Sequence, residues 1–324
     1  MSQPQTPLQL RVARKNSEAQ DICSLELIAP EGALPPFTAG AHLDVRLPNG
    51  LVRQYSLCND PADASRYLIA VLRDANSRGG SQAVHELVEE GALIEVSEPK
   101  NHFPLNEKAP RHLLLAGGIG VTPILAMAER LASLGADFTL HYCTRARERT
   151  AFAQRIAQSR FAAHVHHHFD DAPEDSAHAP LDMAVLLGEV AEGTELYVCG
   201  PQGFMDAALG TARAFGWPEE QLHYEFFGAT EVEGEDAPFE LELASTGQVI
   251  PVAAGQTALA ALMEAGIDVP SSCEQGVCGT CLTRVLKGEP DHRDHYLTPE
   301  EQQAGDQFLP CCSRSKSPRL VLDL

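Results

Sequence analysis

The chain has little positive charge. Its 324 residues include 24 Lys and Arg against 45 Asp and Glu, which gives a formal net charge of −21 at pH 7. An acidic surface repels phosphate, so a nucleic-acid partner is not expected. Between residues 228 and 324 there are 16 acidic and 6 basic residues. This local excess either steers a basic protein partner or serves solubility alone.

Long hydrophobic runs are also missing. No apolar stretch approaches the roughly 20 residues that a membrane-crossing helix needs, and no internal repeat or low-complexity tract is evident. We therefore expect a cytoplasmic protein with no membrane partner, in a compartment that keeps thiols reduced. The hydrophobic content of 44% and charged content of 21% are those of a globular protein, and the length accommodates two or three domains.

Three segments differ in their pattern of apolar residues. Residues 1–107 contain short alternating runs separated by turn residues, which predicts a small antiparallel β-barrel. Residues 108–228 alternate apolar runs with helix-like stretches, which predicts an α/β domain with a parallel sheet. Its five expected strands lie near 113–115, 138–143, 163–169, 196–199 and 222–226. Residues 229–237 are small and acidic and read as a linker, and residues 238–324 form a third domain.

Four cysteines in the third domain carry the strongest signal. Cys273, Cys278 and Cys281 form Cys-x4-Cys-x2-Cys, and Cys311 follows at a distance. This is the plant-type spacing for a [2Fe–2S] cluster. A zinc site is a weaker alternative because zinc usually takes a second spaced pair, whereas here only the adjacent Cys311 and Cys312 remain. A disulfide framework is weaker still.

A glycine-rich turn marks the second domain. An apolar strand runs into Gly117, Gly118 and Gly120, and Thr122-Pro123 then opens a helix. We expect Thr122 to cap this helix, whose free N–H groups and positive dipole end suit a pyrophosphate. The pattern is Gly-x-Gly-x-x-Pro and not the dinucleotide fingerprint Gly-x-Gly-x-x-Gly, and a tight turn without a ligand is the alternative.

A second strand end in the same domain carries Cys199-Gly200-Pro201. Ligands of open parallel sheets bind at the carboxyl ends of strands, and this small thiol followed by Gly-Pro leaves room for a flat ring. Cys199 is also a candidate nucleophile, although no histidine is clearly placed as its base.

Two fragments of the first domain suggest a phosphate and a ring. Arg53-Gln-Tyr55-Ser56 offers a cation and an aromatic side chain on a strand. Arg78-Gly79-Gly80-Ser81 precedes a helix-like run from 82 to 88, and Ser81 is a candidate cap. A surface arginine and an ordinary glycine turn are the alternatives for each fragment.

A histidine run, 164 and 166 to 168, lies on an expected strand. Alternation along a strand lets His164, His166 and His168 share one face. Because such a strand is usually packed or solvated, no metal is assigned to it.

Taken together and in this order, the fragments resemble the phthalate dioxygenase reductase family, flavin reductases that serve Rieske oxygenases. The similarity rests on Arg53 to Ser56, Arg78 to Ser81, Gly117 to Pro123, Cys199-Gly-Pro, Glu225-Phe-Phe-Gly and the cysteine set. It covers essentially the whole chain and implies three domains: a flavin-binding β-barrel, an α/β nucleotide domain and a β-grasp ferredoxin domain.

The resemblance also implies roles for individual residues. FMN would be held by Arg53, Tyr55, Ser56, the backbone of Ala70, Val71 and Leu72, and the phosphate loop Arg78, Gly79, Gly80 and Ser81. Thr122 and Phe227 would approach the flavin ring. The nicotinamide nucleotide would contact Gly117, Gly118, Gly120, Arg145, Cys199 and Gly200. The reacting centre would thus adjoin Thr122, Cys199 and Phe227. The cluster would be held by Cys273, Cys278, Cys281 and Cys311, with Cys311 preferred to Cys312.

The expected function is therefore an NADH-dependent reductase that takes hydride on FMN and passes single electrons through a [2Fe–2S] cluster. Its partner would be a terminal Rieske non-haem iron oxygenase component acting on a small carboxylated or aromatic compound. Two alternatives remain open. One is a redox-sensing iron–sulfur binding module without turnover. The other is the same architecture with FAD and NADPH and a different electron acceptor.

Overall fold

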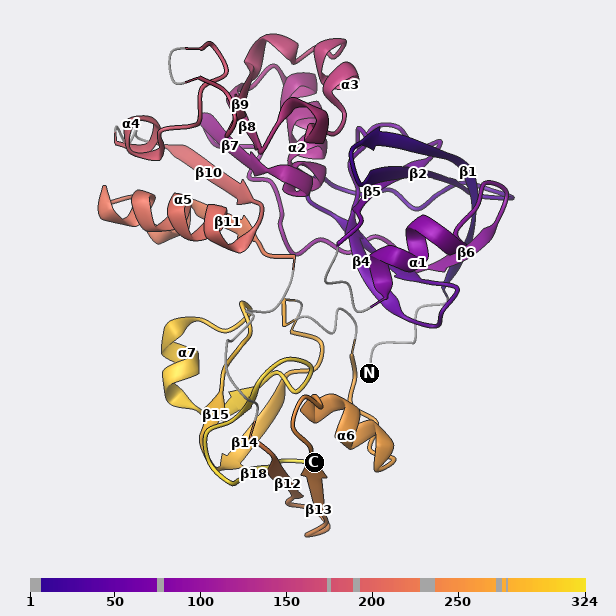
Figure 1. Cartoon of the computed structure of the whole chain (residues 1–324), viewed down its shortest axis with the longest axis vertical. Helices are drawn as coiled ribbons and strands as arrows, with labels where there is room; N and C mark the ends of the chain where they lie inside the picture. Colours follow the sequence, from indigo (N-terminus) through magenta and orange to yellow (C-terminus); the bar gives the residue numbers. More distant parts are fainter. Residues whose placement is uncertain are drawn as a thin grey trace. The chain divides into compact units, whose positions relative to one another are not determined.

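The chain divides into two compact units, Met1–Glu225 and Phe226–Leu324. The computed structural model describes residues 7–74, 79–173, 176–188, 193–227, 237–271, 276–277 and 279–324 (Figure 1). The larger unit holds two hydrophobic core clusters and the smaller unit holds a third. The domain boundaries expected from the sequence stay predictions.

The first part of the larger unit is a six-stranded antiparallel sheet. Its strand order is β4-β3-β6-β1-β2-β5. The strands are β1 (Leu8–Ala19), β2 (Ile22–Ile28), β3 (His42–Arg46), β4 (Val52–Ser56), β5 (Tyr67–Leu72) and β6 (Leu93–Val96). Apolar residues on alternate positions of these strands enclose one core, into which helix α1 (Gly80–Leu87) inserts Ala83 and Val84.

The terminal strands of this sheet, β4 and β5, approach each other at one point. An isolated bridge joins Leu57 and Ile69 just beyond β4. If the antiparallel pairing continued into β4, Ser56 would lie opposite Ala70 and Tyr55 opposite Val71. Among the described residues, however, β4 and β5 pair only at this bridge. The two strands diverge there, and half of the β5 backbone groups at that point face away from β2.

The second part of the larger unit is a five-stranded parallel sheet with the order β11-β10-β7-β8-β9. Its strands are β7 (Arg111–Gly117), β8 (Asp137–Thr144), β9 (Val165–Phe169), β10 (Thr194–Cys199) and β11 (Leu222–Glu225). Its helices are α2 (Val121–Leu134), α3 (Ala153–Ala157), α4 (Met183–Leu187) and α5 (Gln202–Ala214), with short 3-10 turns η1 (Gly118–Gly120), η2 (Arg147–Arg149), η3 (Ala162–His164) and η4 (Glu219–Gln221).

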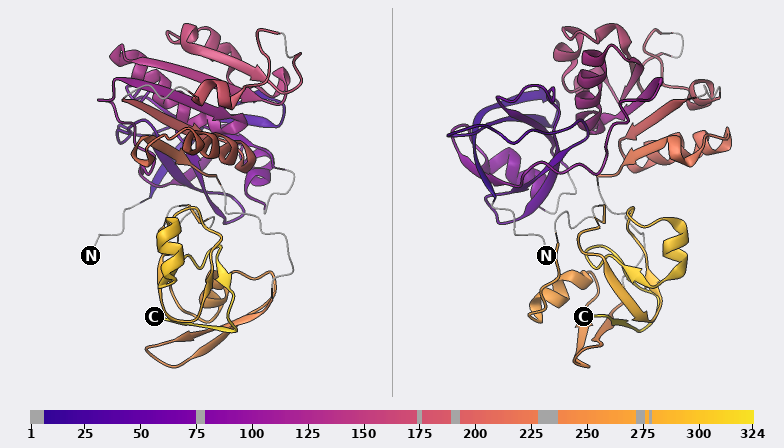
Figure 2. Two further views of the ribbon diagram at one scale, coloured as in Figure 1. Left: turned by 90° about the vertical axis from the view of Figure 1, so that its left-hand side faces the viewer. Right: turned by 180° about the vertical axis from the view of Figure 1, so that it is seen from behind.

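Helices cover both faces of the central strands. Leu114 of β7 and Tyr197 of β10 pack in the same core as α2. The residues directly before them, Leu113 and Leu196, are buried on the opposite face of the sheet. Figure 2 shows α2 and α5 on opposite sides of this sheet. The sequence of β7 is continuously apolar because a parallel strand covered by helices on both sides is buried on both faces. β9 begins at Val165, so His164 lies in the preceding turn and not on the strand as expected.

The smaller unit contains a mixed sheet of order β13-β12-β18-β14-β16 and a separate β15-β17 pair. Its strands are β12 (Phe239–Leu243), β13 (Val249–Val252), β14 (Thr283–Lys287), β15 (Pro290–Asp291), β16 (Gln307–Phe308), β17 (Arg314–Ser315) and β18 (Arg319–Leu322). Helix α6 (Ala258–Glu264) begins after Thr257, whose hydroxyl accepts from the Ala260 N–H at 3.1 Å. Helix α7 (Pro299–Ala304) begins with a capping box between Thr298 and Glu301.

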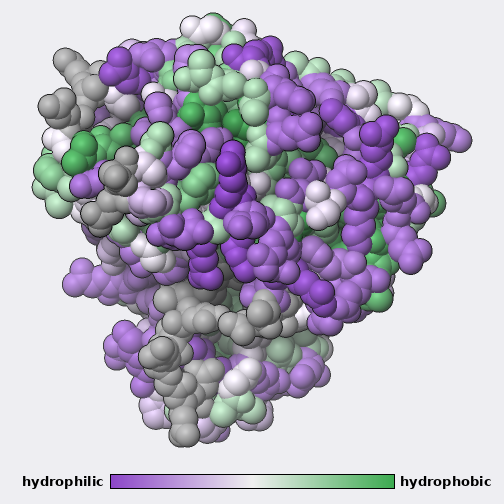
Figure 3. All heavy atoms as spheres, turned by 45° about the horizontal axis from the view of Figure 1, so that its top comes forward, coloured by the Kyte–Doolittle hydropathy of each residue, from purple (hydrophilic) through white to green (hydrophobic). Residues whose placement is uncertain are grey.

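The surface is largely hydrophilic on the face drawn in Figure 3. Hydrophobic residues form smaller groups between the hydrophilic ones. Within the part of the chain that the structure describes, no helix is both long and apolar enough to cross a membrane.

Candidate flavin, nucleotide and cluster sites

Two loops meet at the carboxyl ends of β7 and β10. A Cβ atom on Gly120 would lie 2.3 Å from the carbonyl oxygen of Cys199, and one on Gly200 would lie 3.0 Å from the Cα of Gly117. Gly118 adopts a positive φ of 52°. Only glycine permits this backbone-to-backbone approach. The glycine-rich turn and the Cys199-Gly200 turn therefore form one continuous edge, where ligands of parallel sheets bind.

The helix caps expected from the sequence are wrong. α2 begins at Val121 with Gly120 as its N-cap, and the Thr122 hydroxyl donates to the carbonyl of Ile119 at 3.0 Å. Similarly, α1 begins after Gly79, and the Ser81 hydroxyl accepts from the N–H of Asp74 at 3.1 Å. No side chain caps either helix N-terminus. The Val121 N–H at the start of α2 bonds the carbonyls of Gly118 and Ile119 in the preceding turn, whereas the N-terminus of α1, without a side-chain cap, suits an anion such as phosphate.

Arg53 of β4 lies against the N-terminus of α1. A Cβ on Gly80 would come within 2.9 Å of the Arg53 Nε, and only 8% of Arg53 is exposed. Gly79 has a φ of 90°, which turns the chain into the helix. A buried guanidinium beside an uncapped helix N-terminus fits a phosphate group. Arg78, the other expected phosphate residue, lies outside the described residues.

Of the remaining expected flavin residues, Ala70 and Leu72 pack with the glycine-rich turn, whereas Val71 and Tyr55 pack in the core of the first sheet. Ala70 and Leu72 of β5 pack in the same hydrophobic core as Ile119 of η1, and β5 contacts η1 directly. Tyr55 is partly buried, and this burial raises the pKa of its hydroxyl. The structure thereby brings the β4–β5 opening of the first sheet to the nucleotide edge of the second.

A carboxyl group that the sequence analysis left without a role stands at this junction. Glu225 ends β11, and its Oε2 accepts a hydrogen bond from the Ser56 hydroxyl at 3.3 Å. Burial raises the pKa of Glu225 to about 8, against the lowering effect of Ser56. In the sequence, the only indication that Glu225 has a role at this site is its position at the end of an expected strand, directly before Phe226 and Phe227.

Cys199 lies beside the same carboxyl and is fully buried. Burial, with the nearby Glu225 as a second cause, raises the pKa of the Cys199 thiol well above its usual value. A thiol that stays protonated is a poor nucleophile. Cys199 therefore suits a packing role beside a ring and not covalent catalysis.

Two other expected residues lie at accessible positions. Arg145 is exposed directly after β8, next to the nucleotide edge of the sheet. Phe227 is 38% exposed, which leaves its ring available for stacking. The preceding Phe226 stacks on His295 with ring centroids 3.8 Å apart.

The cluster site is described in part. Cys281 and Cys311 are each 3% exposed and belong to the core of the smaller unit, whereas Cys273 and Cys278 lie outside the described residues. Gly276 and Gly279 have φ angles of 74° and 71°, and a Cβ on Gly276 would lie 2.4 Å from the Cys312 Sγ. Two buried thiols in one core, with positive φ angles at Gly276 and Gly279 shortly before Cys281, fit a thiolate-bound cluster. Within the described ranges, no group of three His, Cys, Asp or Glu side chains is arranged to hold a metal ion.

The histidines form a hydrogen-bonded group of their own. His168 Nδ1 donates to the carbonyl of Ala179 at 2.9 Å, so its Nε2 accepts from His141 Nδ1 at 3.0 Å. Burial, together with His168 and His166, lowers the pKa of His141 to about 4. His164 instead stacks on Phe138.

Two family models match the chain. Residues 241–316 match the 2Fe-2S iron-sulfur cluster binding domain. Residues 96–222 match the N-terminal domain of the dimethylamine monooxygenase subunit DmmA-like family.

Curated proteins and a solved structure match nearly the whole chain. A vanillate O-demethylase oxidoreductase from a Pseudomonas species is 55% identical over 94% of this chain and 96% of its own length. A phthalate dioxygenase reductase from Burkholderia cepacia is 43% identical over 98% and 97%. The solved structure of a phthalate dioxygenase reductase, described as a modular structure for electron transfer from pyridine nucleotides to [2Fe–2S], has a TM-score of 0.81 and 42% identity, covering 98% of each chain.

Proposed function

Because this chain belongs to the phthalate dioxygenase reductase family, we propose that its flavin is FMN, that its electron donor is NADH and that its acceptor is a Rieske-type oxygenase. The protein is an oxidoreductase of the oxygenase-reductase type, in which electrons pass from a pyridine nucleotide through a flavin to a [2Fe–2S] cluster. A bound flavin accepts two electrons as hydride and releases them one at a time, which matches a one-electron cluster.

We propose the residue roles on the contacts described above and, for Cys273 and Cys278, on the cysteine spacing alone. Arg53, with the N-terminus of α1, holds the flavin phosphate. The diverging strands β4 and β5 receive the flavin ring through Tyr55, Ser56 and the backbone of residues 70–72. The glycine-rich turn, Arg145 and the Cys199-Gly200 turn bind the nucleotide, and Phe227 stacks on a ring. Cys273, Cys278, Cys281 and Cys311 hold the cluster.

The convergence of β5 with η1 carries this proposal most directly. It joins the two candidate ring sites within one compact unit. Hydride transfer needs stacking geometry and no side-chain acid or base, so a packed, protonated Cys199 is compatible with it. We further propose that the first sheet is a closed flavin-binding barrel, with the Leu57–Ile69 bridge as its closure, and that the smaller unit is a β-grasp ferredoxin domain.

The partner oxygenase is proposed from the relatives. Identities of 55% and 54% to vanillate O-demethylase oxidoreductases favour an oxygenase that acts on a small carboxylated aromatic compound. The protein would then supply the electrons that such an oxygenase uses in the breakdown of aromatic compounds.

An anaerobic titration tests the cofactor assignments. The purified protein is expected to lose its flavin absorbance on addition of NADH and to respond far more weakly to NADPH. Mass spectrometry of the released flavin is expected to give the mass of FMN. Release of FAD, or reduction by NADPH alone, would contradict the corresponding assignment. Protein that holds iron but shows negligible steady-state NADH oxidation with cytochrome c as acceptor would support the binding-module alternative.

A further inference from the structure

The loop that follows the flavin strand β4 is held rigid by a buried asparagine. Asn59 is 2% exposed, and its Oδ1 accepts from the N–H of Leu68 at 2.9 Å. Its Nδ2 donates to the carbonyls of Asp60, Asp63 and Arg66. The loop is therefore tied to β5 by one side chain, and it has little freedom to move independently of Ser56, which lies three residues before Asn59.

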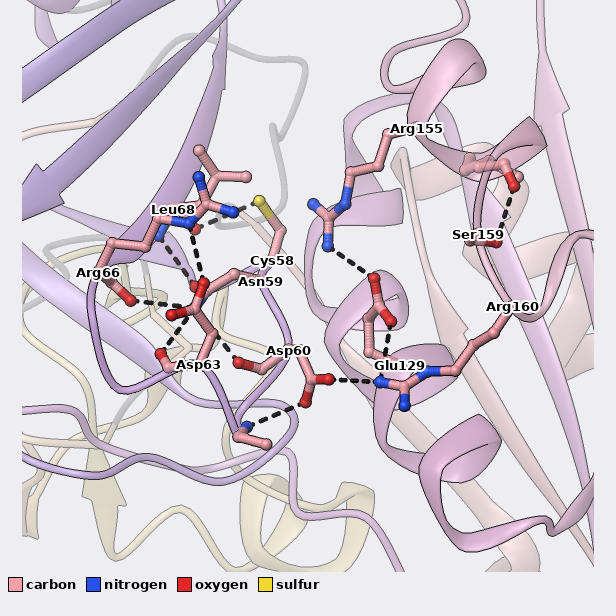
Figure 4. Close-up of polar contacts among 12 residues, drawn as sticks. Cys58, Asn59, Asp60, Asp63, Arg66, Leu68, Glu129, Arg155, Ser159 and Arg160 are labelled. Carbon is pink, nitrogen blue, oxygen red and sulfur yellow. Dashed lines mark hydrogen bonds and ion pairs between the residues drawn. The ribbon is translucent and has the colours of Figure 1, made fainter.

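This loop is joined to the nucleotide-binding part by charged side chains (Figure 4). Asp60 Oδ2 pairs with Arg160 Nη2, and its Oδ1 accepts from the N–H of Ala62 at 2.9 Å. Arg160 Nη2 also lies 3.5 Å from Glu129 Oε2, and Glu129 Oε1 pairs with Arg155 Nη2 at 3.1 Å. We call Asp60, Arg160, Glu129 and Arg155 the ion-pair chain.

The ion-pair chain links the two candidate ring sites. Glu129 is on α2, two helical turns beyond Thr122, and α2 starts at the glycine-rich turn. Asp60 is four residues beyond Ser56. The side chains of Glu129 and Asp60 are 14% and 24% exposed, so solvent screens their interactions less than those of a fully exposed pair.

The surrounding contacts support a fixed geometry. Cys58 is completely buried in the same hydrophobic core as residues of α2 and α3. Burial raises the pKa of the Cys58 thiol to about 12, while the positive charge of Arg155 acts in the opposite direction. Apolar packing alone allows two surfaces to slide, whereas ion pairs of defined geometry fix their register.

We propose that the ion-pair chain sets the distance between the flavin and the nicotinamide, with Asp60 and Arg160 as positioning residues for hydride transfer. The proposal rests on the proposed binding of the flavin at β4–β5 and of the nucleotide at the glycine-rich turn. Neither residue touches the reacting atoms. Their effect is exerted through the loop on one side and α2 on the other.

A double-mutant cycle tests the proposal with the complete protein, loaded with flavin and cluster. Stopped-flow reduction by NADH under argon gives the limiting rate and the NADH dissociation constant separately. Asp60→Asn and Arg160→Gln are each expected to lower the limiting rate about tenfold, since a small misplacement of reacting groups is costly. The double variant is expected to be no slower than either single variant. The NADH dissociation constant and the flavin and iron contents are expected to stay within twofold of the wild type.

A matched control is present in the same unit. Arg213 and Glu219 form an arginine–carboxylate pair at 2.6 Å, with the Arg213 side chain 46% exposed against 48% for Arg160, but both residues lie within the nucleotide-binding part. Arg213→Gln and Glu219→Gln are expected to leave the limiting rate within twofold. Wild-type rates in the Asp60 and Arg160 variants, additive losses in the double variant, or equal losses in the control pair would overturn the proposal. If NADH fails to reduce the wild type, the donor assignment is wrong, and the same variants are compared with NADPH.

Discussion

The Ser56 hydroxyl donates to the carboxyl group of Glu225 at 3.3 Å across 169 positions of sequence, at the junction between the two sheets of the larger unit. Ser56 ends β4 and Glu225 ends β11, so one hydrogen bond connects the candidate flavin strand to the last strand of the parallel sheet.

The raised pKa of Glu225 predicts a pH dependence of stability. Burial raises its pKa to about 8, from an ordinary value of 4.5 in the unfolded chain. The folded state therefore binds one more proton between these values, and the stability due to neutral Glu225 is lost as the pH rises through about 8. Linkage gives a slope near −1.4 kcal/mol per pH unit from this group within the window.

Glu225→Gln is expected to remove that slope, because glutamine stays neutral and keeps an acceptor for Ser56. Denaturant unfolding followed from pH 5.5 to 8.5 measures it. Identical slopes in the variant and the wild type would show that Glu225 does not titrate in this range.

Lys15 stabilises the far end of the candidate phosphate helix. Its ammonium donates to the carbonyls of Val84, His85 and Val88 at 2.9, 2.7 and 2.8 Å. A cation at the C-terminus complements the helix dipole. Lys15→Met is expected to cost about 1–2 kcal/mol of unfolding free energy and to weaken flavin retention.

Arg14, the exposed neighbour of Lys15, supplies the control, because Arg14→Met removes a charge from the same strand. Equilibrium dialysis of released flavin compares the two variants. Equal flavin dissociation constants would show that the α1 terminus does not depend on Lys15.

Gly120 permits the contact between the two nucleotide loops. A Cβ there would lie 2.3 Å from a Cys199 backbone oxygen, so Gly120→Ala must displace one loop. The expected cost is about 3 kcal/mol of unfolding free energy, with weakened NADH binding. Gly210 lies within α5 with no atom within 4 Å of a Cβ, so Gly210→Ala is expected to stabilise by about 0.5–1 kcal/mol. Thermal unfolding and NADH titration distinguish the pair, and equal effects would contradict the close approach.

The adjacent cysteines are expected to differ. Cys311 is buried in the core of the smaller unit, whereas Cys312 is only partly buried, with its Sγ against Gly276. Cys311→Ser is expected to lose most iron while flavin reduction by NADH persists, and Cys312→Ser to keep its iron. Iron analysis with electron paramagnetic resonance of the reduced protein measures both, and equal iron in the two variants would remove the ligand assignment.

The elements most easily predicted were those whose signal is local. The strands expected near 113–115, 138–143, 196–199 and 222–226 each overlap an observed strand, because a buried parallel strand gives a short continuous apolar run in the sequence. Helix starts were less predictable. Thr122 and Ser81 have the right residue type for a cap. The N-cap position of each helix is instead taken by a preceding glycine, Gly120 or Gly79, and the backbone angles of these two glycines differ.

The sequence by itself determined the cluster spacing, the parallel-sheet repeat and the glycine positions, because each depends on residues that are near one another along the chain. Only the tertiary structure decided which distant groups meet: Ser56 with Glu225, Gly120 with Cys199, Asp60 with Arg160. These contacts depend on how two sheets pack, and the pKa of Glu225 depends on the burial that this packing creates. No local pattern encodes either property, because both arise from surfaces that exist only after the chain has folded.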